Sequence, residues 1–177
     1  QMAYDEAPVW IDPPSNQWFG FQVWGMERTA ALYHLTGDDK AKVVLDKWVP
    51  WVKKNVRFTG DGYEVPSTLV WSGRPSMVWD EKNQNWNPRD KAFNAGLHCE
   101  IKDYTNDAGV ASATARTLLW YAARANDLEA ARIAQKLLDV MWTKFRTKKG
   151  VSTPEVRKDY LRFKDPVFVP TGWKGQM

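Results

Sequence analysis

The sequence predicts an all-α fold made of antiparallel helix hairpins, with one long irregular loop that carries short strands. Apolar residues recur at helical spacing in four segments, and these segments form two pairs, each joined by a very short link. A link this short forces its two helices to run antiparallel. The second pair also repeats the first at a shift of 89 positions, which aligns Asp38 with Asp127 and Ala41 with Ala130.

The first helix pair precedes the long loop. Its first helix is predicted from Gln17 to about Leu35 and ends at Gly37, and Asp38 is the expected N-cap of the second helix, which runs from Asp39 to about Val56. Pro50 lies inside the second helix and is expected to kink it or to end it early. The apolar positions of that helix are Ala41, Val44, Leu45, Trp48 and Val52.

Residues 57–102 interrupt the helical pattern. Glycines and prolines divide this region into short extended pieces, such as Tyr63 to Val65 and Leu97 to Ile101. A loop of this length in a compact domain is usually functional. Its three tryptophans make a passive connector the weaker interpretation: Trp71, Trp79 and Trp86.

The second helix pair follows the loop. Asp107 is the expected N-cap of a helix that reaches about Ala125, and another helix is predicted from Asp127 to about Phe145. Pro154 after a threonine predicts a short final helix over residues 153–163. Recurring antiparallel pairs build α-solenoids and closed double rings of helices. Two pairs do not close a ring, so we expect residues 1–177 to form part of a larger helical module.

The composition argues against several classes of protein. The 25 basic residues are interleaved with 21 acidic ones, so the formal charge of +4 and the pI near 9.1 indicate no groove-reading basic motif, and we expect no nucleic-acid partner. No apolar run is long enough to span a membrane, so no membrane partner is expected. The single cysteine, Cys99, excludes an internal disulfide, and two histidines are too few for a histidine or cysteine metal site.

Tryptophan is unusually abundant in this chain. Eleven tryptophans exceed what a core of this size needs for volume alone. Trp is large and amphipathic, so we expect about eight of the rings to lie in the core and the others to face a ligand or an interface.

Four ordered blocks of residues carry a resemblance to a known family. In chain order they are Trp18 to Gln22 with Trp24, Met26 to Arg28 and Thr36 to Asp38; Leu69 to Gly73 with Pro75; Asp103 and Tyr104 with Asp107 and Gly109 to Ala111; and Glu155 to Tyr160 with Arg162, Phe163 and Pro170 to Trp173. With these blocks the chain resembles glycoside hydrolase family 48, from about Val9 to its last residue. The matching part is the latter part of the family's catalytic module. Residues 78–95 are longer and more charged than the family's usual link.

The resemblance implies a ring of six inner and six outer helices, an (α/α)6 barrel, of which residues 1–177 form a part. It also implies a secreted, extracellular cellulase that hydrolyses β-1,4-glucan with inversion and releases cellobiose processively from the reducing chain end. The proton-donating glutamic acid and the proposed aspartate base lie in earlier segments of the family module. We therefore assign no catalytic residue here and expect the isolated chain to be inactive. Some insect members are thought to act on chitin, so the polymer stays open.

The implied partner is cellulose or a cello-oligosaccharide. Trp18 and Trp24 match tryptophans of the family's substrate path, where a pyranose stacks its flat C–H face on the rings; core burial is the alternative. Tyr104 and Asp107 lie at the start of the other inner helix, where Asp107 serves equally well as a helix cap. Arg162 matches an arginine near the product end, with a surface salt bridge as the alternative. Because inner helices of a double ring run parallel, we expect the two helix starts to lie at the same end, so that Trp18, Trp24, Tyr104 and Asp107 converge on one cleft.

Two other acidic residues have separate expected roles. Asp12 matches the family's aspartate near a calcium ion, which implies a structural calcium there. Calcium needs six to eight oxygens, so an Asx-turn with Ser15 and Asn16 is the alternative.

No cofactor is expected for catalysis. Glu27 is expected to form a structural ion pair with Arg28 rather than to donate a proton.

Two further hypotheses stay open. One is a non-catalytic helical module that binds a polysaccharide, and the other is a scaffold of stacked hairpins whose tryptophans all belong to the core. Catalytic carboxylates in an adjoining segment would exclude the first. Full burial of Trp18 and Trp24, with tryptophan fluorescence unchanged by cello-oligosaccharides, would support the second.

Overall fold

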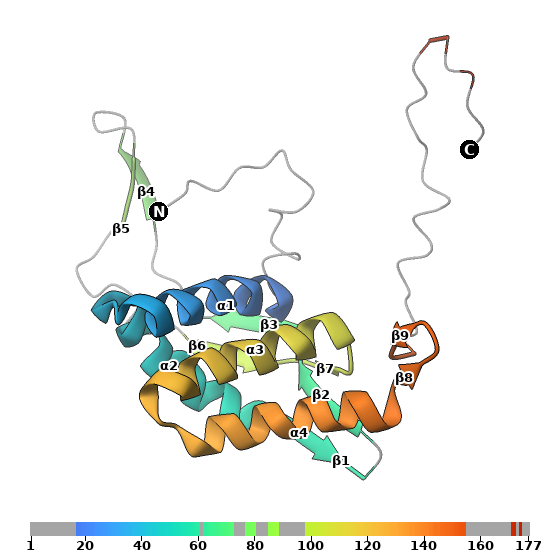
Figure 1. The fold of residues 1–177 in the computed structure, drawn as a ribbon. Coiled ribbons are helices and arrows are strands. Elements are labelled where there is room, and N and C mark those ends of the chain that lie inside the picture. Colours follow the sequence, from blue (N-terminus) through green and yellow to red (C-terminus); the bar gives the residue numbers. More distant parts are fainter. Residues whose placement is uncertain are drawn as a thin grey trace.

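The computed structural model describes residues 17–60, 62–72, 77–80, 85–88, 98–154, 171–172 and 174. Within these residues, four helices form two hairpins: α1 (Phe19–Thr36) with α2 (Asp39–Asn55), and α3 (Ala108–Ala125) with α4 (Leu128–Lys144). Figure 1 shows α1, α3 and α4 side by side, with α2 and several of the strands behind them. The predicted fold of helix hairpins is confirmed, and the arrangement is consistent with part of an (α/α)6 barrel.

Three of the four described helices begin where the sequence places an aspartate cap; α1 instead has Trp18 at its N-cap position, without a side-chain cap and not at the expected Ser15 or Asn16. The carboxylates of Asp38, Asp107 and Asp127 each accept the backbone N–H three residues on, at 2.8, 2.8 and 2.9 Å. Each such cap contributes about 1 kcal/mol. Gly37 ends α1 with a φ of 74°, and Asn126 takes the same left-handed conformation, with a φ of 56°, between α3 and α4. The predicted helix bounds therefore agree with the observed ones to within 2 residues.

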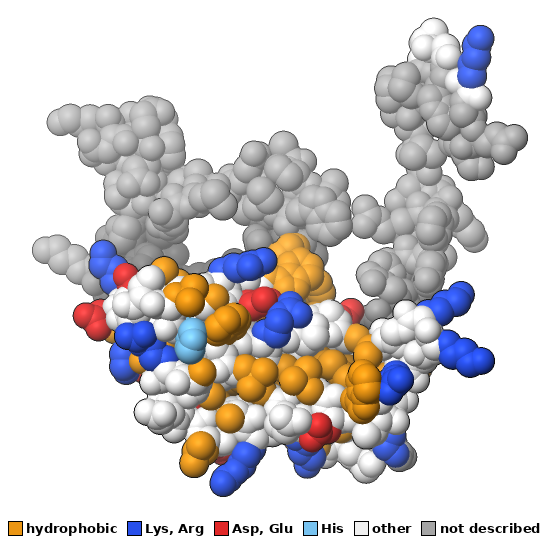
Figure 2. All heavy atoms as spheres, viewed as in Figure 1, with side chains coloured by type: hydrophobic (Ala, Val, Ile, Leu, Met, Phe, Trp, Pro, Cys, Tyr) orange, Lys and Arg blue, Asp and Glu red, His pale blue; other side chains and the backbone are white. Residues whose placement is uncertain are grey.

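The helices α1 and α3 run parallel and pack closely. Arg116 of α3 pairs with Glu27 of α1, 89 residues earlier, and Arg124 of α3 donates to the carbonyl of His34 of α1, 90 residues earlier. The nearly equal separations show that the two helices stay in register along their length. Nine residues of α3 are buried, among them Val110, Leu118 and Tyr121. Figure 2 shows apolar side chains gathered over the exposed face of α1, α3 and α4. The exposed apolar residues of these helices include Leu32, Leu119, Trp120 and Leu128.

The helix α2 runs antiparallel to α1 and continues beyond Pro50. Trp51, near the end of α2, packs against Phe19 at the start of α1, with ring centroids 5.9 Å apart. Pro50 does not end the helix early, because α2 continues to Asn55. Pro50 is exposed, whereas Val49 and Val52 on either side are fully buried. Core packing therefore holds the helix together despite the missing N–H.

The long loop folds into paired strands rather than remaining irregular. Its strands are β1 (Arg57–Thr59), β2 (Gly62–Pro66), β3 (Leu69–Ser72), β4 (Met77–Asp80), β5 (Asn85–Pro88), β6 (His98–Ile101) and β7 (Tyr104–Thr105). They form a sheet in the order β1-β2-β7 and the antiparallel pairs β3-β6 and β4-β5. The predicted extended pieces correspond to β2 and β6. Tyr63 and Val65 of β2 are buried in the same core as the helices, which fixes the sheet against them.

A short hairpin follows α4. Its strands are β8 (Arg146–Thr147) and β9 (Gly150–Val151). The final helix predicted over residues 153–163 lies outside the described residues beyond Pro154. Within the ranges that the structure describes, no helix combines the length and apolar character needed to cross a membrane.

Candidate functional site

Three aromatic side chains meet at the start of α1. The ring centroids of Trp18 and Trp24 are 5.0 Å apart, those of Trp18 and Phe21 are 5.3 Å apart, and those of Phe21 and Trp24 are 5.9 Å apart, all edge to face. Trp24 is 46% exposed and Phe21 is 37% exposed. This aromatic cluster therefore presents ring surface to solvent, and Trp24 is not the buried core residue that a pure scaffold requires.

A glycine and a strand connection fix the position of Trp18. A Cβ at Gly20 would lie 2.5 Å from atoms of the Trp18 ring, so the indole sits where only glycine leaves room. Trp18 forms a backbone bridge with Thr68, and the N–H of Phe19 donates to the carbonyl of Ser67 at 2.7 Å. The link between β2 and β3 thus anchors the first residue of the aromatic cluster.

Asp103 connects the same link to the start of α3. Its carboxylate accepts the Thr68 N–H at 2.8 Å, and its backbone carbonyl accepts the Ser67 N–H at 3.0 Å. Tyr104 follows directly in β7 and pairs with Pro66 of β2. The starts of α1 and α3 are therefore tied together at one end of the molecule, as the parallel packing of inner helices predicted. Asp103 itself has a structural role in this connection.

Tyr104 and Asp107 are both held by local contacts. The Arg57 guanidinium lies 3.6 Å from the centroid of the Tyr104 ring, so one face of that ring is already covered. Asp107 caps α3 through the N–H of Val110, and its own N–H donates to Oγ1 of Thr105 at 3.0 Å. Capping therefore accounts for one carboxylate oxygen of Asp107. The half-buried side chain lies at the N-terminal end of α3.

A polar groove of about 670 Å³ adjoins this end of the helices. Tyr104 and Asp103 line it together with residues of β2, of the link after β2, of the turn before α3 and of the segment after α4; these include Tyr63, Glu64, Ser67, Asn106, Phe145 and Pro154. Burial, together with the nearby Asp107 carboxylate, raises the pKa of Tyr63 to about 12, so its phenol stays protonated at neutral pH. The groove offers neutral and acidic hydrogen-bonding groups beside Tyr104.

Glu27 is part of an ion pair, but its partner differs from the predicted one. Its two carboxylate oxygens accept from Arg116 of α3 at 2.9 and 2.8 Å, whereas Arg28 contributes only a weaker charge effect. These contacts hold the pKa of Glu27 below its usual value. The carboxylate therefore stays ionised and is unsuited to donate a proton, as the sequence analysis expected.

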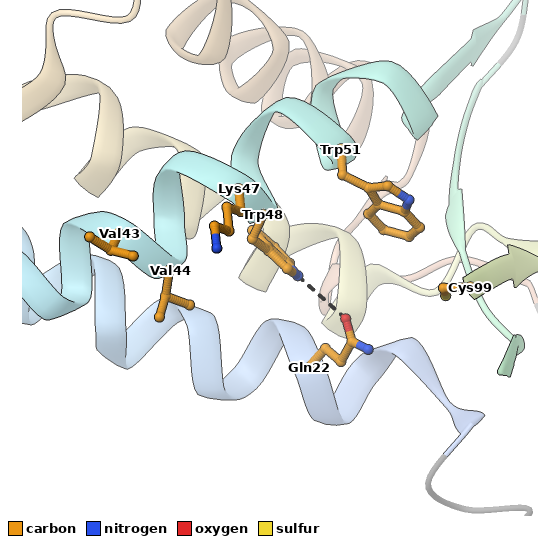
Figure 3. Close-up of a pocket in the computed structure, with 7 residues that line it drawn as sticks. All are labelled: Gln22, Val43, Val44, Lys47, Trp48, Trp51 and Cys99. Carbon is orange, nitrogen blue, oxygen red and sulfur yellow. Dashed lines mark hydrogen bonds between the residues drawn. The ribbon is translucent and has the colours of Figure 1, made fainter. Parts of the chain in front are cut away.

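A second, apolar groove of about 400 Å³ lies between α1 and α2, and Figure 3 shows the residues that line it: Gln22, Val43, Val44, Lys47, Trp48, Trp51 and Cys99. Nε1–H of Trp48 donates to Oε1 of Gln22 at 3.4 Å, and its ring stacks on Phe19 with centroids 5.9 Å apart. The helical spacing of apolar residues grouped Trp48 with the buried face of α2. In the structure Trp48 is partly exposed, because the side chains of α1 beside it leave part of the ring uncovered. The sequence pattern of α2 alone carries no information about these neighbours.

Two predicted site residues lie outside the described part of the chain: Arg162 and Asp12, the latter with its neighbours Ser15 and Asn16. The described residues contain no group of three or more His, Cys, Asp or Glu side chains arranged to hold a metal ion. The structure places Trp18 and Trp24 in the first turns of α1 and Tyr104 and Asp107 at the start of α3, and the link at Ser67 and Thr68 connects these two starts. The calcium prediction is left untested.

The arrangement is suited to binding a ligand that has both apolar faces and hydroxyl groups. Exposed edge-to-face rings offer apolar platforms, and the adjoining groove offers carboxylate, amide and hydroxyl groups. Sugars have this dual character.

Comparison with known proteins identifies the family. Residues 1–177 match the sequence model of glycosyl hydrolase family 48. The chain is 48% identical to endoglucanase F of Ruminiclostridium cellulolyticum and 47% identical to exoglucanase-2 of Thermoclostridium stercorarium, over 99% of its own length in both. It is 40% identical, again over 99% of its length, to the reducing-end cellulose 1,4-beta-cellobiosidase CelS of Acetivibrio thermocellus. It spans 24%, 18% and 24% of these three proteins. The chain, over its whole length, belongs to glycosyl hydrolase family 48.

Proposed function

We propose that this chain supplies substrate subsites to the catalytic module of a cellulase that hydrolyses β-1,4-glucan with inversion and releases cellobiose processively from reducing ends. The observation that carries the proposal is the exposed aromatic cluster beside a polar groove at the joined starts of α1 and α3. The names of the relatives support the substrate, since they describe an endoglucanase, an exoglucanase and a reducing-end cellobiosidase.

In this proposal the glucan chain passes over the aromatic cluster. Trp24 and Trp18 stack on successive sugar faces, which holds the chain through apolar contact while allowing it to slide. Tyr104 turns its uncovered side to the sugar, because Arg57 covers the other face. The free oxygen of Asp107 accepts a sugar hydroxyl. Binding energy from such remote subsites supports turnover at a distant catalytic centre.

The proton chemistry belongs elsewhere in the module. Inverting hydrolysis needs two carboxyl groups about 6.5–9.5 Å apart, one of them protonated when the substrate is bound. Glu27 is held ionised by Arg116 and does not meet that need. The catalytic pair is therefore supplied by family segments that this chain does not match. Arg162 near the product end and a structural calcium near Asp12 complete the proposal, and both rest on the family resemblance.

The proposed location follows from the substrate. Cellulose is an insoluble polymer outside cells, so an enzyme that processes it must be secreted.

A titration tests the proposal. Tryptophan fluorescence of the enzyme that carries this chain is followed as cello-oligosaccharide is added, and the same titration is run on Trp24→Ala and, as a matched control, on Trp120→Ala. Trp120 is 37% exposed near the end of α3, where its ring lies beside His34 near the end of α1. We expect weaker binding and a smaller signal for Trp24→Ala alone. An unchanged signal in all three proteins would refute the sugar-binding role.

The same titration separates the alternatives. Chito-oligosaccharides that bind more tightly than cello-oligosaccharides would move the substrate to chitin. Binding of cello-oligosaccharides without release of cellobiose from amorphous cellulose would identify a non-catalytic binding module instead of a cellulase.

A further inference from the structure

The end of α4 and the β8–β9 hairpin carry a concentrated positive charge. Residues 140–154 contain four basic side chains and no acidic one; the basic residues are Lys144, Arg146, Lys148 and Lys149. Of the 25 basic residues in the chain, this leaves 21 to match the 21 acidic ones. The charges of the rest of the chain cancel, so the net formal charge of +4 equals the charge of this segment, which we call the basic hairpin. The sequence analysis treated the basic residues as interleaved with acidic ones and did not identify this cluster.

The hairpin backbone is held by its own hydrogen bonds. Oγ1–H of Thr147 donates to the carbonyl of Gly150 at 2.8 Å, and the N–H of Lys149 donates to Oγ1 of Thr147 at 3.1 Å. The N–H of Ser152 donates to the carbonyl of Phe145 at 2.9 Å. Both strands are exposed along their length. The cations therefore project from a defined turn, and Figure 2 shows Lys and Arg side chains gathered over this part of the molecule.

An exposed indole lies beside these cations. Trp142 is 61% exposed, and Cζ of Arg146 lies 4.1 Å from the centroid of its ring. This cation–π contact orders the guanidinium before any ligand arrives. Within the described residues, no carboxylate lies within ion-pair distance of Arg146, Lys148 or Lys149. The basic hairpin therefore combines an aromatic surface with three cations, Arg146, Lys148 and Lys149, that no described carboxylate pairs with.

We propose that Trp142 and the basic hairpin form a second carbohydrate-binding surface, specific for polysaccharides that carry uronic-acid carboxylates. Ammonium and guanidinium groups bind carboxylates through charge-assisted hydrogen bonds, and the indole packs on the apolar face of a pyranose. A neutral β-glucan has no charge that would pair with Arg146, Lys148 and Lys149. The surface lies on α4 and the hairpin after it, whereas the aromatic cluster lies at the start of α1.

The charge part of the proposal is tested with polygalacturonate and the enzyme that carries this chain. The variant Arg146→Gln/Lys148→Gln/Lys149→Gln removes three cations, and each cation near an anionic surface accounts for about a fivefold change in affinity, so about 100-fold weaker binding is expected. The control Lys40→Gln/Lys54→Gln/Arg132→Gln removes the same charge from exposed positions elsewhere. It should bind within about threefold of the parent, and rates on cellulose should match in all three proteins.

The sugar part of the proposal is tested with Trp142→Ala. Loss of stacking should weaken binding to polygalacturonate about two- to tenfold and leave binding to polyglutamate, an anion without sugar rings, unchanged. Equal losses in the two triple variants would reduce the effect to net charge and overturn the proposal. Tighter binding to duplex DNA than to polygalacturonate would assign the surface to nucleic acid and would also overturn it.

Discussion

Replacing Trp24 by Phe separates a sugar-stacking role from a core role. Trp24 is 46% exposed and touches Trp18 and Phe21 through ring edges. An edge-to-face pair contributes about 0.5–1.5 kcal/mol, and phenylalanine keeps much of it, so we expect a loss below about 1 kcal/mol. That corresponds to a fall in Tm of less than about 4 °C for a unit of 150–250 residues. The ring area available to a sugar falls by roughly 50 Å². At about 25 cal/mol per Å² this weakens binding about eightfold.

The assay combines melting curves with rates on amorphous cellulose and on a short soluble oligosaccharide. A processive enzyme depends on remote subsites for long chains, so the rate on cellulose should fall more than the rate on the oligosaccharide. Trp48→Phe is the matched control. Trp48 stacks on Phe19, which is fully buried, and donates to Gln22. This control should lose more stability and should affect both substrates equally.

A different pattern would refute the reasoning. If Trp24→Phe lowers Tm by several degrees more than Trp48→Phe and reduces both rates equally, Trp24 belongs to the core. The aromatic cluster would then be a packing feature of α1 rather than part of the substrate path.

Three other predictions test the site and its surroundings. Gly20→Ala should weaken cello-oligosaccharide binding and lower Tm, because the added Cβ displaces the Trp18 ring. The control Gly25→Ala adds a Cβ that meets nothing within 4 Å and should raise the free energy of unfolding by about 0.5–1 kcal/mol. Similar Tm changes in both variants would contradict the placement of Trp18. Glu27→Gln should cost about 0.5–1 kcal/mol, since Arg116 is half exposed. The pKa of Glu27 is lowered from 4.5 in the folded protein, so the difference in unfolding free energy between parent and variant should be complete above about pH 4.5 and vanish as acid protonates the folded carboxylate. Urea unfolding of both proteins from pH 7 to 3 measures this difference. A difference that stays constant over this pH range would exclude the ion pair. The isolated 177-residue chain should release no cellobiose from amorphous cellulose, and sustained release by the purified chain would show that it contains its own acid and base.

Local chemistry made most of the helical fold predictable. Asp38, Asp107 and Asp127 cap helices through contacts only three residues away, and Gly37 ends α1 in a conformation that favours glycine. Signals of this kind lie within one short stretch of sequence. Pro50 misled because burial of neighbouring residues outweighs one missing hydrogen bond, and burial depends on the whole fold.

Contacts between distant segments were harder to predict. Glu27 pairs with a residue 89 positions away rather than with its neighbour, and Asp103 bonds to Thr68, 35 positions away. The convergence of the starts of α1 and α3 was predictable because a repeated hairpin implies parallel inner helices. The groove between α1 and α2 was not predictable, since it depends on side chains of two helices and a strand.

The central claim is that a glucan chain runs over the aromatic cluster at the joined starts of α1 and α3. A crystal structure of the enzyme that carries this chain, in complex with a cello-oligosaccharide, tests it directly. The account predicts a glucose ring stacked on Trp24 or Trp18, with hydroxyl contacts to Asp107 or Tyr104. A bound oligosaccharide that lies elsewhere, with Trp24 covered by protein, would contradict it.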